Sequence, residues 1–359
     1  MDKSHILQCV KIVREYGGIK LKKVSIKDVA REAGVSITTV SRALNGYMDI
    51  SESTKKKIYA VVKQLDYVPN TNARSLGGIE ETNIALLTSE LTSTDKSGMV
   101  YGLLCGLSGQ CTEQGYEFML LATNLAKQQK LSFNQLCKKK NLSGVVVAGL
   151  KTGDPYHKEI MESNIPCVGI DMQMHGSKKC SVSIDNIKAA KEAVSYLVQL
   201  GHKKIGMING SKEADVSGQR YSGYVSALID SGISLKLDYM INCDFLEPVA
   251  YEKTKQFLKD YPEITALFCA SDLMAIGAIK AIEELGKRVP EDISVVGFDD
   301  IPVSEYICGG ITTIRQNPMY LGNESGKVIA SILKGEQEED HVYVPYELII
   351  RNTTAMCKD

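Results

Sequence analysis

Several features are missing from this 359-residue sequence, and each absence removes a class of protein. No run of 18 or more apolar residues occurs, which argues against a membrane-spanning helix. The N-terminus has no uninterrupted apolar segment followed by a small-residue cleavage site, so we expect no secretory signal. The sequence therefore predicts a cytoplasmic protein without membrane contact.

The patterns of metal sites and of common enzymes are also missing. None of the ten cysteines forms a C-x-x-C pair, and the five histidines are scattered, so we expect reduced thiols, no metal and no cofactor. No G-x-G-x-x-G follows a strand, and no G-x-S-x-G occurs. The stretch "GVVVAGLKT" approaches a phosphate-binding loop, but Leu150 separates Gly149 from Lys151 and the spacing fails. We expect no catalytic residues and no enzyme activity.

The charge that is present is unevenly distributed. The whole chain carries a net charge of −1, whereas residues 1–80 carry +6 and the remainder −7. A basic head on an acidic body is typical of a nucleic-acid-binding segment attached to another domain. A small, solvated, lysine-rich domain is the alternative that charge alone leaves open.

The segment that begins "VSIKDVAREAGVSITTVSRALNG" predicts two short helices joined by a tight turn. Ser25 and Asp28 have the spacing of a capping box, and Gly34 stands where a helix ends on a left-handed residue. Ser36 then caps a second helix that runs to Asn45. Such a pair is a helix-turn-helix, whose second helix meets base edges in the major groove. A helical hairpin with a polar outer face remains the alternative. The residues exposed on this second helix are Ile37, Thr38, Ser41 and Arg42.

A third helix follows from Ser51 and ends at Tyr67-Val68-Pro69. Its inner face would carry Ile58, Val61, Val62 and Leu65, and its outer face the lysines 55–57. Three lysines near a helix start oppose the helix dipole, a small cost that phosphates would neutralise.

These segments, with "LDYVPNTNARSLGG", "LGHKKIGMING", "ALFCASDLMAIGAIKAIEELGKRVPEDISVVGFDD" and "YELIIRNTT", resemble the LacI/GalR (lactose repressor/galactose repressor) family of transcriptional regulators. The resemblance covers residues 24–355 in order. It implies an all-α helix-turn-helix headpiece at 24–70 and a hinge helix at 71–81. It further implies an α/β core at 82–359, made of two doubly wound parallel-sheet lobes like those of periplasmic binding proteins. Residues 1–23 lie outside it, as an extra helix or a dispensable extension.

The resemblance also implies the DNA contacts. Arg42 would pair with guanine, while Ile37 and the Thr38 methyl group suit thymine methyl groups. In the family the hinge becomes helical on the operator, where Leu76 would wedge a base step of the minor groove apart. The implied DNA-binding residues are Ser25, Ser36, Ile37, Thr38, Ser41, Arg42, Asn45, Lys56, Tyr67, Asn70, Ala73 and Leu76.

From Asn83 onward, short apolar runs alternate with helical patterns, which predicts parallel sheets between helices. The pattern restarts near Asp185 and indicates two lobes, and the resemblance implies that the chain crosses between them near 182–185, 309–316 and 340–345. Ligands of such sheets bind at the carboxyl ends of the strands, in the cleft between the lobes.

By the same resemblance, the effector-binding residues are Ser89, Asp171, Arg220, Phe245, Ser271, Asp299 and Gln316. Carboxylates and a guanidinium can bind adjacent hydroxyls while an aromatic face covers C–H groups, which favours a sugar or polyol. Asp272 and Asp300 are expected to be helix caps instead. Met99 and Val100 stand near positions where relatives carry aromatics, and Ser271 is shorter than their asparagine. A phosphosugar or a nucleobase therefore stays open beside a free sugar.

Together these patterns predict a repressor that binds a pseudo-palindromic operator and responds to a small-molecule effector. No leucine heptads follow the core, so we expect a homodimer rather than a coiled-coil tetramer. A sugar-transport solute-binding protein is the alternative, although it would have no use for the basic head.

Overall fold

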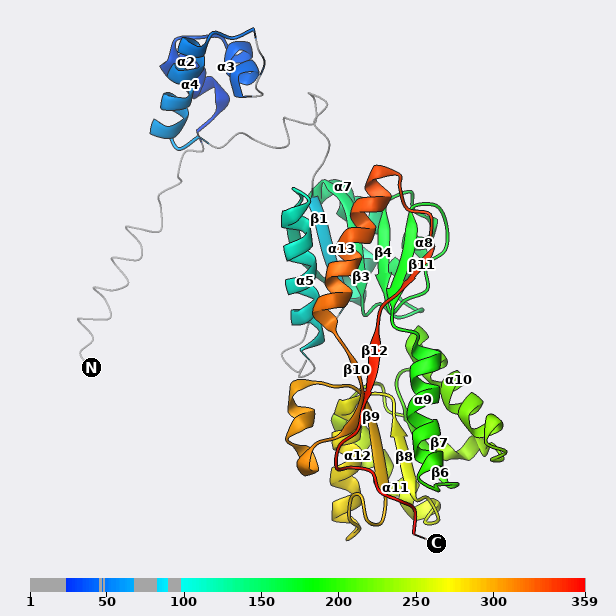
Figure 1. The fold of residues 1–359 in the computed structure, drawn as a ribbon. Coiled ribbons are helices and arrows are strands. Elements are labelled where there is room, and N and C mark those ends of the chain that lie inside the picture. Colours follow the sequence, from blue (N-terminus) through cyan, green and yellow to red (C-terminus); the bar gives the residue numbers. More distant parts are fainter. Residues whose placement is uncertain (1–23, 45–46, 48, 68–82, 90–97, 359) are drawn as a thin grey trace, which may run out of the picture. The chain divides into compact units, whose positions relative to one another are not determined.

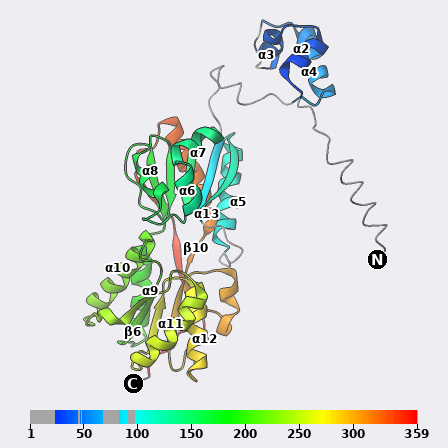
Figure 2. The same ribbon diagram turned by 180° about the vertical axis from the view of Figure 1, so that it is seen from behind.

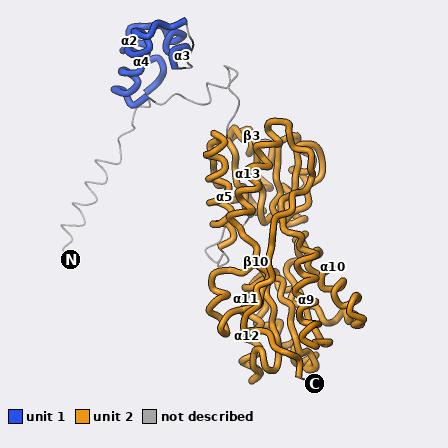
Figure 3. The backbone as a smooth tube through the Cα atoms, viewed as in Figure 1, with its two compact units in different colours: residues 1–80 blue, residues 81–359 orange. Residues whose placement is uncertain are grey.

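The computed structural model describes residues 24–44, 47, 49–67, 83–89 and 98–358. The chain divides into two compact units, residues 1–80 and 81–359 (Figure 3). Asn45, Asn70, Ala73 and Leu76, four of the predicted DNA-binding residues, lie outside the described residues, as do the extension 1–23 and the hinge.

The described residues of the first unit form helices α2 (Ile26–Ala33), α3 (Ile37–Leu44) and α4 (Glu52–Gln64) (Figure 1). The carboxylate of Asp28 accepts hydrogen bonds from the Ser25 backbone N–H and hydroxyl, at 3.0 and 2.6 Å. Gly34 ends α2 at a φ of 64°, and the Ser36 hydroxyl accepts the Thr39 N–H at 3.0 Å. The predicted caps and turn are therefore confirmed. The buried core between the helices consists of Val29, Ala30, Ala33, Val40, Ala43, Ile58, Val61 and Tyr67.

The second unit begins with a six-stranded parallel sheet, lobe 1, in the order β11-β5-β4-β3-β1-β2. Its strands are β1 (Asn83–Ser89), β2 (Glu117–Thr123), β3 (Leu142–Ala148), β4 (Cys167–Ile170), β5 (Lys179–Ser183) and β11 (His341–Tyr343). Helices α5 (Met99–Glu113) and α13 (Pro318–Lys334) cover one face (Figures 1 and 2). The other face is covered by α6 (Leu125–Lys130), α7 (Phe133–Lys140) and α8 (Pro155–Glu162).

Lobe 2 is a second six-stranded sheet, in the order β12-β10-β9-β8-β6-β7, parallel except for β12 against β10. Its strands are β6 (Ile205–Asn209), β7 (Met240–Asn242), β8 (Ala266–Cys269), β9 (Ser294–Asp299), β10 (Thr312–Gln316) and β12 (Tyr346–Ile349). The paired helices α9 (Asn186–Gln199) and α10 (Asp215–Asp230) lie on one face. The paired helices α11 (Glu247–Asp260) and α12 (Asp272–Glu284) lie on the other (Figure 2). The predicted fold class is confirmed.

The chain passes between the two lobes three times, after β5, β10 and β11 (Figure 1). The connecting residues are 184–185, 317 and 344–345. The second passage was expected at 309–316, but residues 312–316 pair with β9 as strand β10 of lobe 2. The passage therefore comes at Asn317, which also caps α13.

The close packing of α5 on α13 depends on glycine. A Cβ added at Gly106 would lie 1.9 Å from the carbonyl oxygen of Met319, and one added at Gly322 would lie 2.3 Å from that of Leu103. The two helix backbones are thus in direct contact. By contrast, a Cβ at Gly109 on the same helix would meet nothing within 4 Å.

Candidate functional site

Arg220 on α10 is the centre of a buried polar network between the lobes. Its Nε donates to Asn186 Oδ1 at 2.9 Å, and its Nη1 donates to the Ala270 carbonyl at 2.5 Å. The guanidinium carbon lies 3.7 Å from the centroid of the Phe298 ring, and the side chain is only 3% exposed. Hydrogen bonds and the ring face therefore fix the guanidinium in one orientation.

Two carboxylates join the network from opposite lobes. Asp171, which follows β4 of lobe 1, accepts the Asn186 amide N–H at 3.2 Å. Asp299, the last residue of β9 in lobe 2, lies 3.6 Å from Arg220 Nη1 and accepts the Gln316 amide N–H at 2.7 Å. Four predicted effector residues are thus brought together, and Asn186 was missed. Its place directly after the first passage between lobes was the available signal.

Burial makes both carboxyl groups poor anions. It raises the pKa of Asp299 to about 7, against the opposing effect of the Arg220 guanidinium. It also raises the pKa of Asp171, with Arg220 and the hydrogen bond from Asn186 again opposing. Gln316 Oε1 is buried without a hydrogen-bond partner among the described residues. The network therefore offers acceptors that a ligand's hydroxyl groups could satisfy.

A cavity of about 280 Å³ opens between the lobes next to this network. Its lining contains Asp171 and Phe245 of the predicted set, and Asp171 belongs both to the cavity and to the buried network. Met99, flagged as a departure from relatives, also lines it. The lining polar residues that the sequence prediction missed are Lys151, Thr152, His157, Ser211, Asp215 and Asp244.

Left-handed backbone conformations cluster around the cavity. Asp171, Asp244 and Phe245 have φ values of 54°, 53° and 60°. Such conformations disfavour residues other than glycine and concentrate where function requires a particular geometry. Here they turn the Phe245 ring onto Gly210, where an added Cβ would lie 2.0 Å from the ring. The backbone therefore holds Phe245 as one wall of the cavity.

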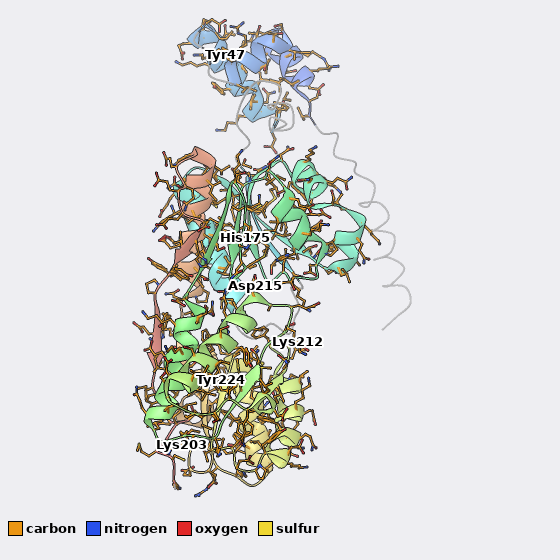
Figure 4. The ribbon with its side chains drawn as sticks, turned by 90° about the vertical axis from the view of Figure 1, so that its right-hand side faces the viewer. Tyr47, His175, Lys203, Lys212, Asp215 and Tyr224 are labelled. Atoms are coloured by element: carbon orange, nitrogen blue, oxygen red, sulfur yellow. The ribbon has the colours of Figure 1, made fainter. Side chains whose placement is uncertain are left out.

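Two hydrogen bonds join the lobes at the mouth of the cavity. The Thr152 N–H donates to the Glu213 carbonyl at 2.9 Å, and the Gln173 N–H donates to Asp215 Oδ2 at 2.8 Å. Figure 4 shows Asp215 where the lobes meet, with His175 in lobe 1 and Tyr224 and Lys203 farther along lobe 2. The two lobes are therefore in direct contact beside the cavity.

The remaining predicted effector residues lie apart from this constellation. Ser271 caps α12, where its hydroxyl accepts the Met274 N–H at 3.3 Å, and it is 4% exposed. Ser89 ends β1 and is not among the described residues of the cavity lining.

The expectation that Asp272 and Asp300 cap helices is wrong. Asp272 is fully buried, and its carboxylate accepts from the Ile301 N–H and from the hydroxyls of Ser304 and Thr313, at 3.0, 2.6 and 2.6 Å. Asp300 pairs with two arginines, 315 and 351, at 2.7 and 2.6 Å. Both residues anchor the loop after β9.

In the headpiece, α3 presents the residues expected to read bases. Ile37, Thr38 and Arg42 are exposed, and Ser41 is half-buried. Arg42 Nη2 lies 2.6 Å from Asp49 Oδ2, and the guanidinium carbon lies 5.1 Å from the centroid of the Tyr47 ring. This exposed face combines apolar groups with a cation.

Two expectations for α4 and its end need correction. Tyr67 is only 8% exposed and packs in the headpiece core, which leaves little of it to contact DNA. Lys55 does not project freely, since its ammonium lies 3.0 Å from Glu52 and its side chain is 15% exposed. Lys56 is exposed as expected, as is Ser25 before α2.

Comparison with known proteins decides the family. A family model described as bacterial regulatory proteins, lacI family, matches residues 25–70, and one for a periplasmic binding protein-like domain matches 194–354. The transcriptional regulator MalR of Clostridium butyricum is 32% identical over 336 residues, covering 92% of this chain and 99% of that protein. The chain belongs to the LacI family of bacterial regulatory proteins. It is therefore a DNA-binding transcriptional regulator, and the transport alternative is wrong.

Two solved structures of transcriptional regulators match this chain over nearly its whole length. The Lac repressor dimer bound to operator and the anti-inducer ONPF is 27% identical, with a TM-score of 0.79, covering 93% of this chain and all of that one. The regulator CelR in complex with cellobiose is 26% identical, with a TM-score of 0.71, covering 92% and 99%. The headpiece followed by a two-lobed core is thus the family's arrangement.

The described residues contain neither a candidate metal site nor a candidate membrane-spanning helix. No cluster of three His, Cys, Asp or Glu side chains is arranged there to hold a metal ion. Nor does any helix in that part of the chain have the length and apolar character needed to cross a bilayer. In the core, the buried network of Arg220, Asp171 and Asp299 lies between the two lobes.

Proposed function

We propose that this regulator acts in the cytoplasm as a homodimeric repressor whose operator affinity is set by a sugar-like effector bound between the lobes. The observation that carries the proposal is the buried network of Arg220, Asp171 and Asp299 beside a cavity lined by both lobes. A ligand that touches both lobes can change their arrangement, and a headpiece attached to lobe 1 can transmit that change to DNA. Regulation of this kind requires no catalysis, so we propose that the protein is not an enzyme.

The chemistry of the cavity favours a polyhydroxyl ligand. Asp171 lines the cavity, and the orphaned oxygen of Gln316 belongs to the adjoining network; both can accept hydrogen bonds that hydroxyl groups donate. Phe245 supplies a flat apolar wall for C–H groups. The cavity volume of about 280 Å³ suits a small ligand. Cellobiose bound to CelR shows that one relative takes a sugar. We propose Asp171, Arg220, Phe245, Asp299 and Gln316 as the effector site.

On DNA, we propose that α3 enters the major groove of each half-site. Ile37 and Thr38 would contact thymine methyl groups, and Arg42 would bind guanine. The other polar residues and the hinge residues of the predicted set would bind phosphates and the minor groove and so position the headpiece on the DNA. These are Ser25, Ser36, Ser41, Asn45, Lys56, Asn70, Ala73 and Leu76.

An exposed apolar face supports the dimer. Tyr101 on α5 and Met319 and Tyr320 on α13 are 73%, 57% and 44% exposed, and these two helices pack side by side (Figure 1). Exposed apolar groups gathered on neighbouring helices are typical of subunit interfaces. The related Lac repressor was solved as a dimer on its operator.

The test begins with operator selection from random DNA by the full-length protein. Retardation of the selected DNA is then measured with and without a panel of sugars, phosphosugars and nucleobases. Asp299→Asn should retain DNA binding and lose the response to any active compound, because it changes the network but not the headpiece. Asp292→Asn, an exposed carboxylate of the same lobe, is the matched control and should respond like wild type. A panel in which every compound leaves DNA binding unchanged, or an Asp299→Asn protein that still responds, would contradict the proposed site.

A further inference from the structure

We infer that Asp49 and Tyr47 position Arg42 for a single guanine, and that Asp49 thereby sets how strongly the headpiece prefers its operator to other DNA. The inference rests on the proposed operator-binding role of α3. It adds two residues, which lie after the recognition helix, to those that determine specificity.

The first support is the geometry around the guanidinium. Arg42 Nη2 lies 2.6 Å from Asp49 Oδ2, and the guanidinium carbon lies 5.1 Å from the centroid of the Tyr47 ring. Among the residues that the structure describes, no other carboxylate pairs with Arg42. The arginine is therefore held from two sides, by a carboxylate and by a ring within the range of a cation–π contact.

The second support is that both holding residues are themselves anchored. The Tyr47 N–H donates to the Arg42 carbonyl at 3.1 Å, which ties Tyr47 to the end of α3. Ile50, next to Asp49, packs against the headpiece core, and Ser51 caps α4 by accepting the Thr54 N–H at 3.2 Å. The positions of the carboxylate and the ring are thus fixed by the fold of the headpiece rather than by Arg42 alone.

The third support is the number of hydrogen-bond donors that arginine carries. A guanidinium has five N–H donors in one plane. Nη2 carries two of these N–H groups, so Asp49 can take the one on the Nε side while the other, together with Nη1, forms the edge that pairs with O6 and N7 of guanine. One arginine can therefore bind its carboxylate and one base at the same time. Because its rotamer is already restricted in the free protein, less side-chain entropy is lost on binding that base.

The carboxylate has an opposite effect on other DNA. The exposed negative charge of Asp49, beside α3, repels DNA phosphates, and a phosphate that binds Arg42 must compete with Asp49 for the guanidinium. On the operator, the contact between Arg42 and guanine offsets the repulsion between Asp49 and the phosphates. On unrelated DNA no such contact offsets it. Both side chains of the pair are about half exposed, at 45% and 51%, so the effect is a few-fold rather than a large one.

The test uses the full-length protein and the operator that it selects from random DNA. Arg42→Ala first identifies the base pair at which preference is lost, and all four base pairs are then placed at that position. For Asp49→Asn we expect discrimination at this position to fall about two- to fivefold, while affinity for unrelated DNA rises. Glu52→Gln is the matched control, because Glu52 is also an exposed acid in an ion pair of this headpiece, 3.0 Å from Lys55. Glu52→Gln should change the affinity for all DNA equally and leave discrimination at this position unchanged.

A double variant separates positioning from charge. In an Arg42→Ala background, Asp49→Asn should leave discrimination at this position unchanged. As a single variant, Tyr47→Phe should discriminate like wild type, because the ring is kept. Equal effects of Asp49→Asn and Glu52→Gln on discrimination would overturn the inference, since charge alone would then explain them. Circular dichroism confirms that each variant is folded. A wild-type protein that selects no sequence would instead overturn the proposed function itself.

Discussion

Replacing Arg220 with methionine should destabilise the core far more than an ordinary loss of an arginine. The guanidinium is 3% exposed and lies against two buried carboxyl groups, Asp171 and Asp299. Removing one partner of a buried ionic network leaves the others without compensation, which costs about 3–5 kcal/mol. The same change at Arg288, which is 67% exposed and pairs with Asp292, should cost far less, because solvent screens an exposed ion pair.

The loss should also depend on pH. Burial already raises the pKa of both carboxyl groups, and Arg220 opposes it, so the pKa values rise further in Arg220→Met. A carboxyl group whose folded pKa exceeds its unfolded value binds more protons in the folded state. Its contribution to stability therefore falls as pH rises from the unfolded pKa toward the folded one. Between pH 6 and 8 each carboxyl group that stays protonated in the folded variant lowers stability by at most about 1.4 kcal/mol per pH unit, and wild type, in which the pKa of Asp299 is about 7, should lose less over the same range.

Urea denaturation followed by circular dichroism at pH 6 and pH 8 measures both effects, since the chain has no tryptophan for fluorescence. Adding Asp299→Asn to Arg220→Met should restore part of the lost stability at pH 8, because it removes one uncompensated carboxylate. A loss no larger than that of Arg288→Met, or one that is the same at both pH values, would refute the reasoning. The consequence for function is practical: Asp299→Asn, and not a change at Arg220, is the clean probe of effector binding.

Other predictions concern packing, protonation and capping. Gly109→Ala should stabilise α5 by about 0.5–1 kcal/mol, because the added Cβ meets nothing. Gly106→Ala should destabilise the core by about 1–3 kcal/mol, because its Cβ would meet the Met319 backbone. Urea unfolding must therefore give changes in unfolding free energy of opposite sign for the two variants. Burial lowers the pKa of His202, so the stability that its neutral ring supplies is present above about pH 6.5 and is lost as pH falls through the folded pKa. His202→Gln should make the urea midpoint less dependent on pH between 7 and 5, and an unchanged slope would argue against this. Ser36→Ala should cost the headpiece about 1 kcal/mol, seen as faster hydrogen exchange of α3 amides; unaltered exchange would exclude the cap.

The strands that the sequence predicted were those made of apolar runs. The stretch "GVVVAG" became β3, and "ISVVGF" became β9, because strands buried on both faces are apolar throughout. Strand β5, with the sequence KCSVS, gave no such signal although every residue in it is buried. Its polar groups are satisfied by tertiary contacts: Lys179 donates to the carbonyls of Ser163 and Ile165, and the Ser181 hydroxyl accepts the Met174 N–H. Those partners are far from obvious in the linear sequence.

The site was predicted to a similar extent and for a similar reason. Asp171 and Asp299 follow recognisable strands, so the rule that ligands bind at strand ends found them. Asp215 and Lys151 line the cavity with Asp171 but belong to different lobes, and only the packing of the lobes brings them together. Ser271 follows β8 at the predicted edge, and its hydroxyl also caps the next helix, which the strand-end rule does not foresee.

The three passages between the lobes limit how the core can be divided. Lobe 1 takes its first five strands from residues 83–183 but its covering helix α13 and edge strand β11 from 318–343, after the chain has built most of lobe 2. Neither lobe is therefore a continuous stretch of polypeptide. An expression fragment that ends near residue 184 would lack α13, the helix on which Gly106 of α5 packs, and would expose the apolar face of its own sheet. A minimal ligand-binding fragment of this protein must therefore retain residues 83–358 as one piece, and fragments cut at the boundary between the lobes should aggregate.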